Sequence, residues 1–196
     1  SKEYEEIRRL GAGAFGEAYL IREVGSAGGK SRRQLVAKRC AISRIATERD
    51  RKASLREIQL LRQLRHACVA ELVDILVPSR REYCLIMPYY SRGDLQSRIN
   101  NVDAKALRTW PAMRILNWFT QLLQACEYIH GRGVLHRDIK PGNVFVTWGD
   151  NIVLGDFERT RGTTQLLDTN AMREMSAAVG SPQYMAPEWF ATTSQE

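Results

Sequence analysis

The sequence predicts an α+β protein with two parts, an antiparallel sheet with one main helix followed by a mainly helical region. Short apolar segments separated by glycines fill the first third of the chain, whereas the middle changes to apolar residues spaced by three and four. The 196 residues are 44% hydrophobic and 26% charged, which is typical of a globular protein. We place the division at residues 1–88 and 89–196.

Five strands are expected in the first part. Two of them, at residues 7–10 and 18–24, flank a glycine-rich turn, and the third, at 34–38, follows the flexible turn at 25–29. Two more are expected at residues 72–77 and 83–87. Between the third and fourth strands, residues 48–64 predict a charged helix, because one apolar stripe recurs at spacings of three, formed by Leu55, Ile58, Leu61 and Leu64.

The second part contains the strongest helix signal. After a connector at residues 88–93, Asp94 is expected to begin a short helix. Thr109 and Pro111 then mark the start of a long helix that ends at Gly131, and its many apolar positions make it too apolar for a surface helix. Short strands at 144–147 and 151–154 flank a turn.

Composition excludes several classes of protein. No apolar run approaches the roughly 20 residues that span a bilayer, and the first residues lack the features of a signal peptide, so we expect a cytosolic or nuclear protein and no membrane partner. The net charge of +7 comes from scattered arginines, which favours a solvated basic surface over a nucleic-acid site. The widely spaced cysteines, Cys40, Cys68, Cys84 and Cys126, are expected to be buried free thiols.

Gly11, Gly13 and Gly16 form a G-x-G-x-x-G pattern between the first two strands. Glycines leave backbone N–H groups accessible to phosphate oxygens. Dinucleotide-binding folds share the spacing, but a helix follows it there, whereas residues 18–21 predict a strand. A mobile hairpin tip without a ligand is the alternative. In the third strand, Lys38 could hold phosphates if an anion such as Glu57, on the next helix, held its side chain.

The segment His136-Arg137-Asp138-Ile139-Lys140-Pro141-Gly142-Asn143, followed by Asp156-Phe157, combines carboxylates, an amide and a lysine. Such groups supply the positioning and charge neutralisation that phosphoryl transfer needs. The segment resembles the catalytic loop and metal-binding turn of the protein kinase family. The resemblance implies a bilobal kinase fold that uses ATP and Mg²⁺. By the same resemblance, Asp138 would accept the substrate proton, Lys140 would steady the γ-phosphate, and Asn143 and Asp156 would hold magnesium.

The resemblance covers essentially the whole chain and implies further nucleotide contacts. Met87 would be the gatekeeper, Tyr89 a hinge residue, and Asp94 a partner of the ribose. Ala18, where most kinases have valine, and Ala37 would contact the nucleotide. A stack of core side chains typical of active kinases would comprise Leu61, Leu72, His136 and Phe157, which ordinary core packing would also explain.

Lys140 and the segment Gly-Ser-Pro-Gln-Tyr-Met-Ala-Pro-Glu at 180–188 are similar to the serine/threonine branch, which implies protein substrates with serine or threonine. Residues 115–121, 93–95 and 154–157 are similar to NIMA-related kinases, a subfamily often tied to cilia, centrosomes and mitosis. This similarity implies a ciliary or cytoskeletal assembly as a partner, and a location in the cytoplasm, cilium, cytoskeleton or centrosome.

The sequence departs from the family pattern in two further respects. Glu158 stands where kinases have the glycine of Asp-Phe-Gly, so a nucleotide-binding pseudokinase or scaffold is the alternative function. The chain also stops at Glu196, soon after the activation segment, so we expect a fragment whose helical lobe is truncated and whose long helix lacks its cover. Within that segment, Ser176 is a candidate phosphorylation site that could pair with Arg137, although an ordinary polar loop is the alternative.

Overall fold

The structure, a computed structural model, describes residues 3–13, 16–24, 30–41, 58, 61–79, 82–103, 110–157, 161–162 and 181–187. Contacts divide the chain into two compact units, one formed by Ser1–Arg65 with Ala70–Tyr89 and the other by His66–Val69 with Tyr90–Glu196. Among the described helices, none is both long and apolar enough to cross a membrane.

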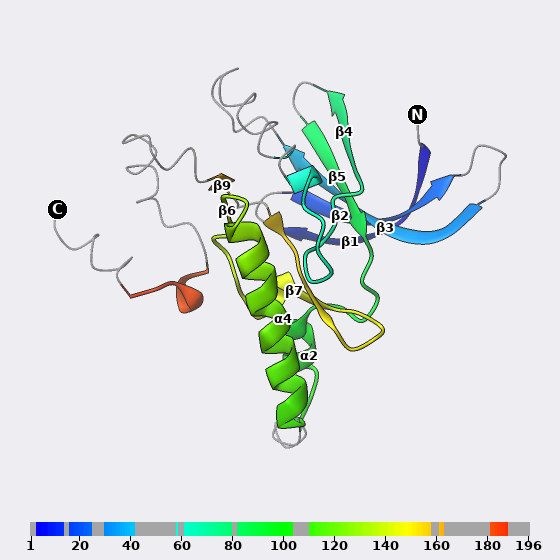
Figure 1. The fold of residues 1–196 in the computed structure, drawn as a ribbon. Coiled ribbons are helices and arrows are strands. Elements are labelled where there is room, and N and C mark those ends of the chain that lie inside the picture. The colour runs from blue at the N-terminus through cyan, green and yellow to red at the C-terminus, as the bar shows by residue number, and fades with distance from the viewer. Residues whose placement is uncertain are drawn as a thin grey trace. The chain divides into compact units, whose positions relative to one another are not determined.

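The first unit contains one five-stranded sheet, as the sequence predicts (Figure 1). All neighbouring strands are antiparallel, and their order is β1-β2-β3-β5-β4. The bounds are β1 Glu3–Gly13, β2 Gly16–Val24, β3 Lys30–Ala41, β4 Asp74–Ser79 and β5 Glu82–Pro88. The first three strands are longer than predicted, because the ladder continues through charged residues that carry no apolar signal.

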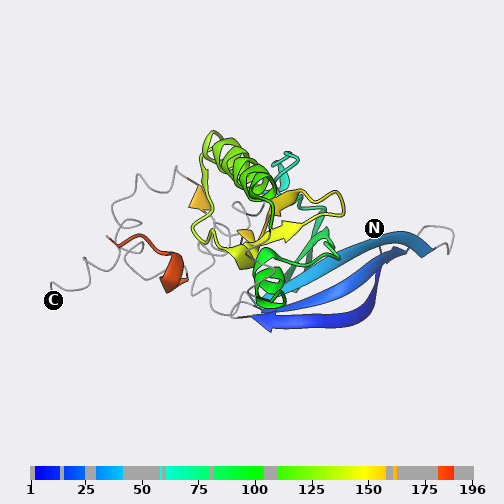
Figure 2. The same ribbon diagram turned by 90° about the horizontal axis from the view of Figure 1, so that it is seen from below.

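One face of this sheet carries the apolar core of the unit. The core consists of Ile21, Leu35, Ala37, Cys84 and Ile86, and partly buried side chains, among them Tyr4, pack against it. Figure 2 shows how strongly β1, β2 and β3 curve. The Tyr4 hydroxyl on β1 donates to Asp74 Oδ2 on β4 at 3.3 Å, which joins the two outermost strands of the sheet. Burial and the nearby Asp74 carboxylate raise the pKa of Tyr4 to about 12.

The helix predicted at 48–64 lies mostly outside the described residues, and so do Leu55 and Glu57. Its described end is helical at Ile58 and at residues 61–62, whereas Leu64 lies beyond the helix. The three described members of the predicted apolar stripe, Ile58, Leu61 and Leu64, are all buried.

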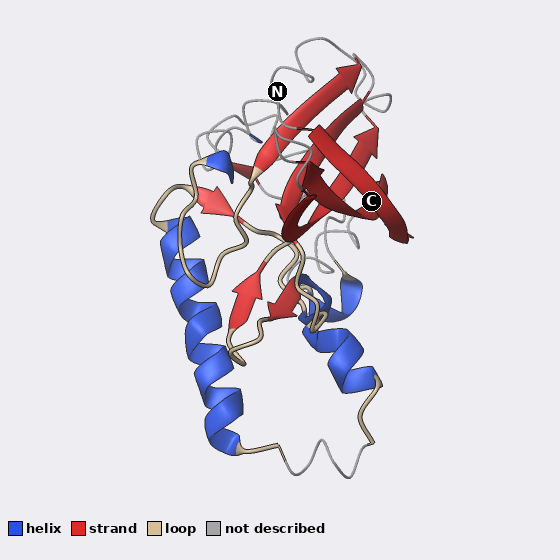
Figure 3. Cartoon of the chain, turned by 90° about the vertical axis from the view of Figure 1, so that its right-hand side faces the viewer, coloured by secondary structure: helices blue, strands red, loops and turns tan. Residues whose placement is uncertain are grey.

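The second unit contains the two described helices of more than one turn, α2 (Leu95–Asn100) and α4 (Ala112–His130). The hairpin formed by β7 (Val144–Val146) and β8 (Ile152–Leu154) lies between them, with β7 against α2 and β8 against α4 (Figure 3). A second two-stranded sheet pairs β6 with β9, at Val134–Leu135 and Arg161–Gly162. The sequence did not predict this pair, because two residues are too few to show a periodicity.

The prediction that α4 is too apolar for a surface helix is half right. Trp118, Ala125 and Ile129 are buried on one side of the helix. Large apolar side chains on the rest of its circumference are exposed within the part of the chain that the structure describes, namely Met113, Ile115, Leu116, Phe119 and Leu123.

The cysteine prediction is confirmed for three of the four thiols. All four cysteines are free; Cys40, Cys68 and Cys84 are buried, and Cys126 is half-buried. Burial raises the pKa of the Cys84 thiol to about 11, so this thiol stays protonated at neutral pH.

Candidate active site

The glycine-rich turn connects β1 to β2, as predicted. Gly11 and Gly13 lie at the end of β1, and Gly13 pairs with Gly16, the first residue of β2. Gly16 has a φ of 153°, and a Cβ on it would lie 1.8 Å from the carbonyl oxygen of Arg39. Only glycine therefore fits position 16, whereas a Cβ on Gly11 would meet open space.

Predicted nucleotide contacts share one face of the five-stranded sheet. Lys38 on β3 pairs with Ala18 on β2 and with Leu85 on β5, and Val36 pairs with Met87. Directly paired residues of an antiparallel ladder project to the same face, and so do residues two apart on one strand. Ala18, Lys38 and Met87 therefore lie on a common face.

Ala37 lies on the other face of the sheet. It is buried in the core cluster with Leu35 and Ile86, and a strand's side chains alternate between faces, so it cannot share the face of Lys38. Val36, two residues before Lys38, lies on the face of Lys38 instead. Side chains alternate between the two faces of a strand, so counting back two residues from Lys38 would have identified Val36 in the sequence.

The hinge residues have local roles that are visible in the structure. The Tyr89 amide donates a hydrogen bond to the Gln34 carbonyl on β3 at 3.3 Å. Asp94 is the N-cap of α2, as predicted; its Oδ1 accepts from the Ser97 amide at 2.7 Å and its Oδ2 from the Ser97 hydroxyl at 2.6 Å. A role for Asp94 in ribose binding stays a prediction.

Two of the predicted catalytic side chains and one predicted metal residue meet in the second unit. Asp138 is 6% exposed, and the Asn143 amide donates to its carbonyl at 2.7 Å and to its Oδ2 at 3.1 Å. Lys140 Nζ lies 2.9 Å from the same Oδ2. A buried carboxylate is stable only when paired and hydrogen-bonded, and this loop supplies both kinds of partner within five residues.

Ser181, for which the sequence predicted no role, completes this group. Its hydroxyl accepts from Lys140 Nζ at 2.7 Å and donates to Asp138 Oδ1 at 3.2 Å. The three side chains thus form a closed triangle, which we call the carboxylate triangle. Ser181 is 43 residues away from Asp138 in sequence, so only its place in the segment 180–188 could have indicated the contact.

Both ring nitrogens of His136 contact the backbone around the catalytic loop. Its Nε2 lies 2.8 Å from the Gly155 carbonyl, and its Nδ1 accepts from the Asp138 amide at 3.3 Å. These partners require the neutral tautomer with the proton on Nε2. Burial of the ring, which is 1% exposed, lowers the pKa of His136.

The second predicted metal residue is brought next to the first by the β7–β8 hairpin. The Gly155 amide donates to the Asn143 carbonyl at 2.9 Å, so Asp156 directly follows the residue that pairs with Asn143. Asp156 has a φ of 59° and Arg137 a φ of 67°. Left-handed angles are costly for residues other than glycine and concentrate at functional sites.

The donor set fits Mg²⁺ bound together with phosphates. Nowhere in the described ranges do three or more His, Cys, Asp or Glu side chains cluster as a metal site. Mg²⁺, however, commonly binds proteins through one or two carboxylates and takes its other ligands from water and substrate phosphates. Because the Asn143 nitrogen faces Asp138, its Oδ1 points away from that carboxylate and would offer Mg²⁺ a hard oxygen, as the Asp156 carboxylate would.

Glu158, Ser176 and Thr109 lie outside the described residues. In the proposed stack, His136 contacts Phe157 with ring centroids 4.9 Å apart, which confirms this pair. Leu61 and Leu72 are buried in the other unit, so the full stack stays a prediction.

Comparisons with known proteins agree with this geometry. The protein kinase domain model matches residues 4–196. Serine/threonine-protein kinase Nek3 of Oryza sativa subsp. japonica is 31% identical over 190 residues, covering 97% of this chain and 30% of the relative. Nek5 of Homo sapiens is 33% identical over 190 residues, covering 94% and 24%. CBL-interacting protein kinase 4 of Oryza sativa subsp. japonica is 37% identical over 188 residues, covering 94% and 38%.

The chain therefore spans between 24% and 38% of the length of these three relatives. The family model covers nearly the whole chain, and the relatives named as Nek serine/threonine kinases match 95–97% of it. This chain belongs to the protein kinase domain family, in its serine/threonine branch and with similarity to the NIMA-related kinases.

Proposed function

We propose that the protein containing this chain is an active protein kinase that transfers the γ-phosphate of ATP to serine or threonine hydroxyls of proteins. The observation that carries the proposal is the carboxylate triangle of Asp138, Lys140 and Ser181, with Asn143 bound to the same carboxylate. A buried carboxylate with a lysine at 2.9 Å provides a base and a cation in one place.

In this proposal Asp138 receives the proton of the attacking hydroxyl. Its orientation is fixed by Asn143 at Oδ2 and by Ser181 at Oδ1, so the carboxylate needs little reorganisation when the substrate arrives. Lys140 neutralises charge on the transferred phosphoryl group, and Lys38 holds the phosphates. Asn143 and Asp156 would hold Mg²⁺, which, when bound, neutralises the charge of the triphosphate.

The test uses the full chain and a generic basic protein as substrate. Asp138→Asn should abolish phosphorylation while the nucleotide-induced rise in melting temperature persists, because the amide keeps the shape but cannot take a proton. Gln124→Ala, on the exposed side of α4, is the matched control and should behave as wild type. Equal activity of Asp138→Asn and wild type would remove Asp138 from the mechanism.

A nucleotide-binding pseudokinase is the second candidate, and Glu158 in place of the family glycine favours it. A side chain at this position penalises left-handed backbone angles by roughly 1–2 kcal/mol. In this case MgATP raises the melting temperature but no phosphate is transferred, and Glu158→Gly increases turnover much more than affinity. If neither turnover nor affinity changed in Glu158→Gly, the substitution would be incidental.

We further propose a location in the cytoplasm, at a cilium, centrosome or other cytoskeletal assembly. The support is the similarity to Nek kinases, seen in rice, mouse and human relatives. Fluorescence imaging of the tagged protein in ciliated cells would test this. Uniform fluorescence with no enrichment at cilia or centrosomes would contradict this location.

A further inference from the structure

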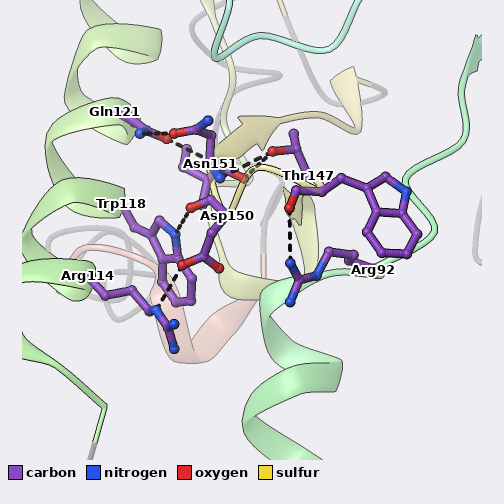
Figure 4. A network of polar contacts seen from close by, with 9 residues as sticks. Arg92, Arg114, Trp118, Gln121, Thr147, Asp150 and Asn151 are labelled. Carbon is purple, nitrogen blue, oxygen red and sulfur yellow. Dashed lines mark hydrogen bonds and ion pairs between the residues drawn. The ribbon is translucent and has the colours of Figure 1, made fainter.

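The turn between β7 and β8 is held on α4 by three polar side chains (Figure 4). Arg114, Trp118 and Gln121 are spaced by four and three residues, so they lie on one face of the helix. We call these three residues the α4 anchor. No role of these residues follows from the kinase motifs of the sequence.

The first two members hold the tip of the turn. Arg114 Nε lies 2.9 Å from Asp150 Oδ2, and Trp118 Nε1 donates to the Asp150 carbonyl at 2.7 Å. Trp118 is 5% exposed, so this hydrogen bond satisfies a buried donor. Asp150 itself has a φ of 60°, a conformation that persists only where the surroundings fix it.

Gln121 holds β8 itself. Its Oε1 accepts from the Ile152 amide at 2.8 Å, and its Nε2 donates to Asn151 Oδ1 at 2.8 Å. The Ile152 amide points away from β7, because the bond on the inner side runs from the Thr147 amide to the Asn151 carbonyl. Gln121 therefore takes the place of a neighbouring strand at this edge.

The same edge of β8 is held once more at its other end. The Leu154 amide donates to the Cys68 carbonyl at 2.9 Å. Both outward amides of β8 thus have fixed partners, one from a side chain of α4 and one from the backbone at Cys68. A short two-stranded hairpin is only marginally stable by itself, so these external bonds help the turn and the three buried side chains of β8 to fix its register.

The register of this hairpin decides where the two metal-binding residues stand. Val144 pairs with Leu154, and the next rung joins the Asn143 carbonyl to the Gly155 amide. A slip by one residue would shift β8 by about 3.3 Å and turn its side chains to the opposite face. The Gly155 amide would then no longer meet the Asn143 carbonyl, and Asp156 would move from its place next to this rung.

We propose that Gln121 is a positioning residue for metal–nucleotide binding, acting through the register of β8. The inference rests on the proposed function, because it assigns Asn143 and Asp156 to the metal. Residues that hydrogen-bond directly to metal ligands typically contribute 10- to 100-fold to metal affinity, and Gln121 acts through β8 and not on a ligand, so we expect an effect at the lower end of this range.

The experiment measures the melting temperature of the full chain while Mg²⁺ is titrated at a fixed concentration of a non-hydrolysable ATP analogue. The quantity compared between variants is the Mg²⁺ concentration that gives half of the maximal rise in melting temperature. Gln121→Leu removes both hydrogen bonds and should raise this concentration about 10-fold. Gln121→Glu keeps an oxygen acceptor for the Ile152 amide and should show a smaller rise. Gln124→Ala, three residues along the same helix, should match wild type.

The outcomes separate this inference from the proposed function. Melting temperatures without ligand report any general loss of stability, and a destabilised Gln121→Leu is replaced by Gln121→Glu for the comparison. If Gln121→Leu and Gln121→Glu both keep the wild-type Mg²⁺ dependence, the positioning role is refuted while the proposed function stands. If wild type itself shows no Mg²⁺ dependence, the metal assignment of the proposed function fails, and the inference fails with it.

Discussion

Ser181→Ala is the substitution that most directly probes the carboxylate triangle. It deletes the hydroxyl that accepts from Lys140 Nζ at 2.7 Å and donates to Asp138 Oδ1 at 3.2 Å, and it leaves the direct contact between Lys140 and Asp138 in place. The base and the cation therefore both remain, but the carboxylate loses the donor that fixes the orientation of its Oδ1.

The size of the effect follows from the number and the environment of the lost bonds. A hydrogen bond to a charged group contributes about 1.5–3 kcal/mol, and two such bonds are removed. Ser181 is half-buried, so water can replace part of what is lost. We expect the net loss to equal about one such bond, which corresponds to a fall in kcat of about 10- to 150-fold.

The assay is steady-state phosphorylation of a protein substrate by wild type, Ser181→Ala and Ser181→Thr. Because the hydroxyl orients the base and does not contact ATP in this scheme, kcat should fall while KM for ATP stays near wild type. Threonine retains the hydroxyl and should retain most of the activity. A kcat of Ser181→Ala within about 2-fold of wild type would show that the triangle is not needed to position Asp138.

Two further predictions concern stability. Gly16→Ala places a Cβ 1.8 Å from the Arg39 carbonyl oxygen and should lower the melting temperature and weaken ATP binding. Gly11→Ala is the control, because a Cβ there meets open space and should change the free energy of unfolding by no more than about 0.5 kcal/mol. Equal melting temperatures of the two variants would contradict the steric argument. Burial lowers the pKa of His136 below its ordinary value of 6.5, so the stability that the neutral ring contributes is fully present above pH 6.5 and is lost as the pH falls through the lower native pKa. On acidification, the urea midpoint of wild type should therefore fall toward that of His136→Gln. A difference between the two midpoints that grows on acidification would contradict this direction of the pKa shift.

Much of the fold was predictable because the relevant signals are local. Alternating apolar residues and glycine turns predicted the five strands of the first unit, and Asp94 marked the start of α2. The contacts among Asp138, Lys140 and Asn143 were predictable because these residues lie within five positions of one another, so a single loop brings them together.

Contacts over long distances in sequence were not predictable from such patterns. Ser181 reaches Asp138 across 43 residues, and Gln121 reaches Ile152 across 31. Both are small or medium polar residues, which are common on any surface and carry no periodic signal. The error at Ala37 had a different cause, since the alternation of faces along β3 was available in the sequence and pointed to Val36.

The backbone of the site shows why motif residues alone do not explain it. Arg137 and Asp156 both adopt left-handed backbone angles, with φ values of 67° and 59°. The identity of a residue such as arginine does not predict this conformation, because its side chain disfavours it. Such angles persist only where neighbouring bonds outweigh their cost of about 1–3 kcal/mol each. Two hydrogen bonds beside these residues converge on Gly155, whose carbonyl lies 2.8 Å from His136 Nε2 and whose amide donates to the Asn143 carbonyl at 2.9 Å. Because Gly155 joins β8 to Asp156, anything that fixes β8, including Gln121, helps to hold the site in this conformation.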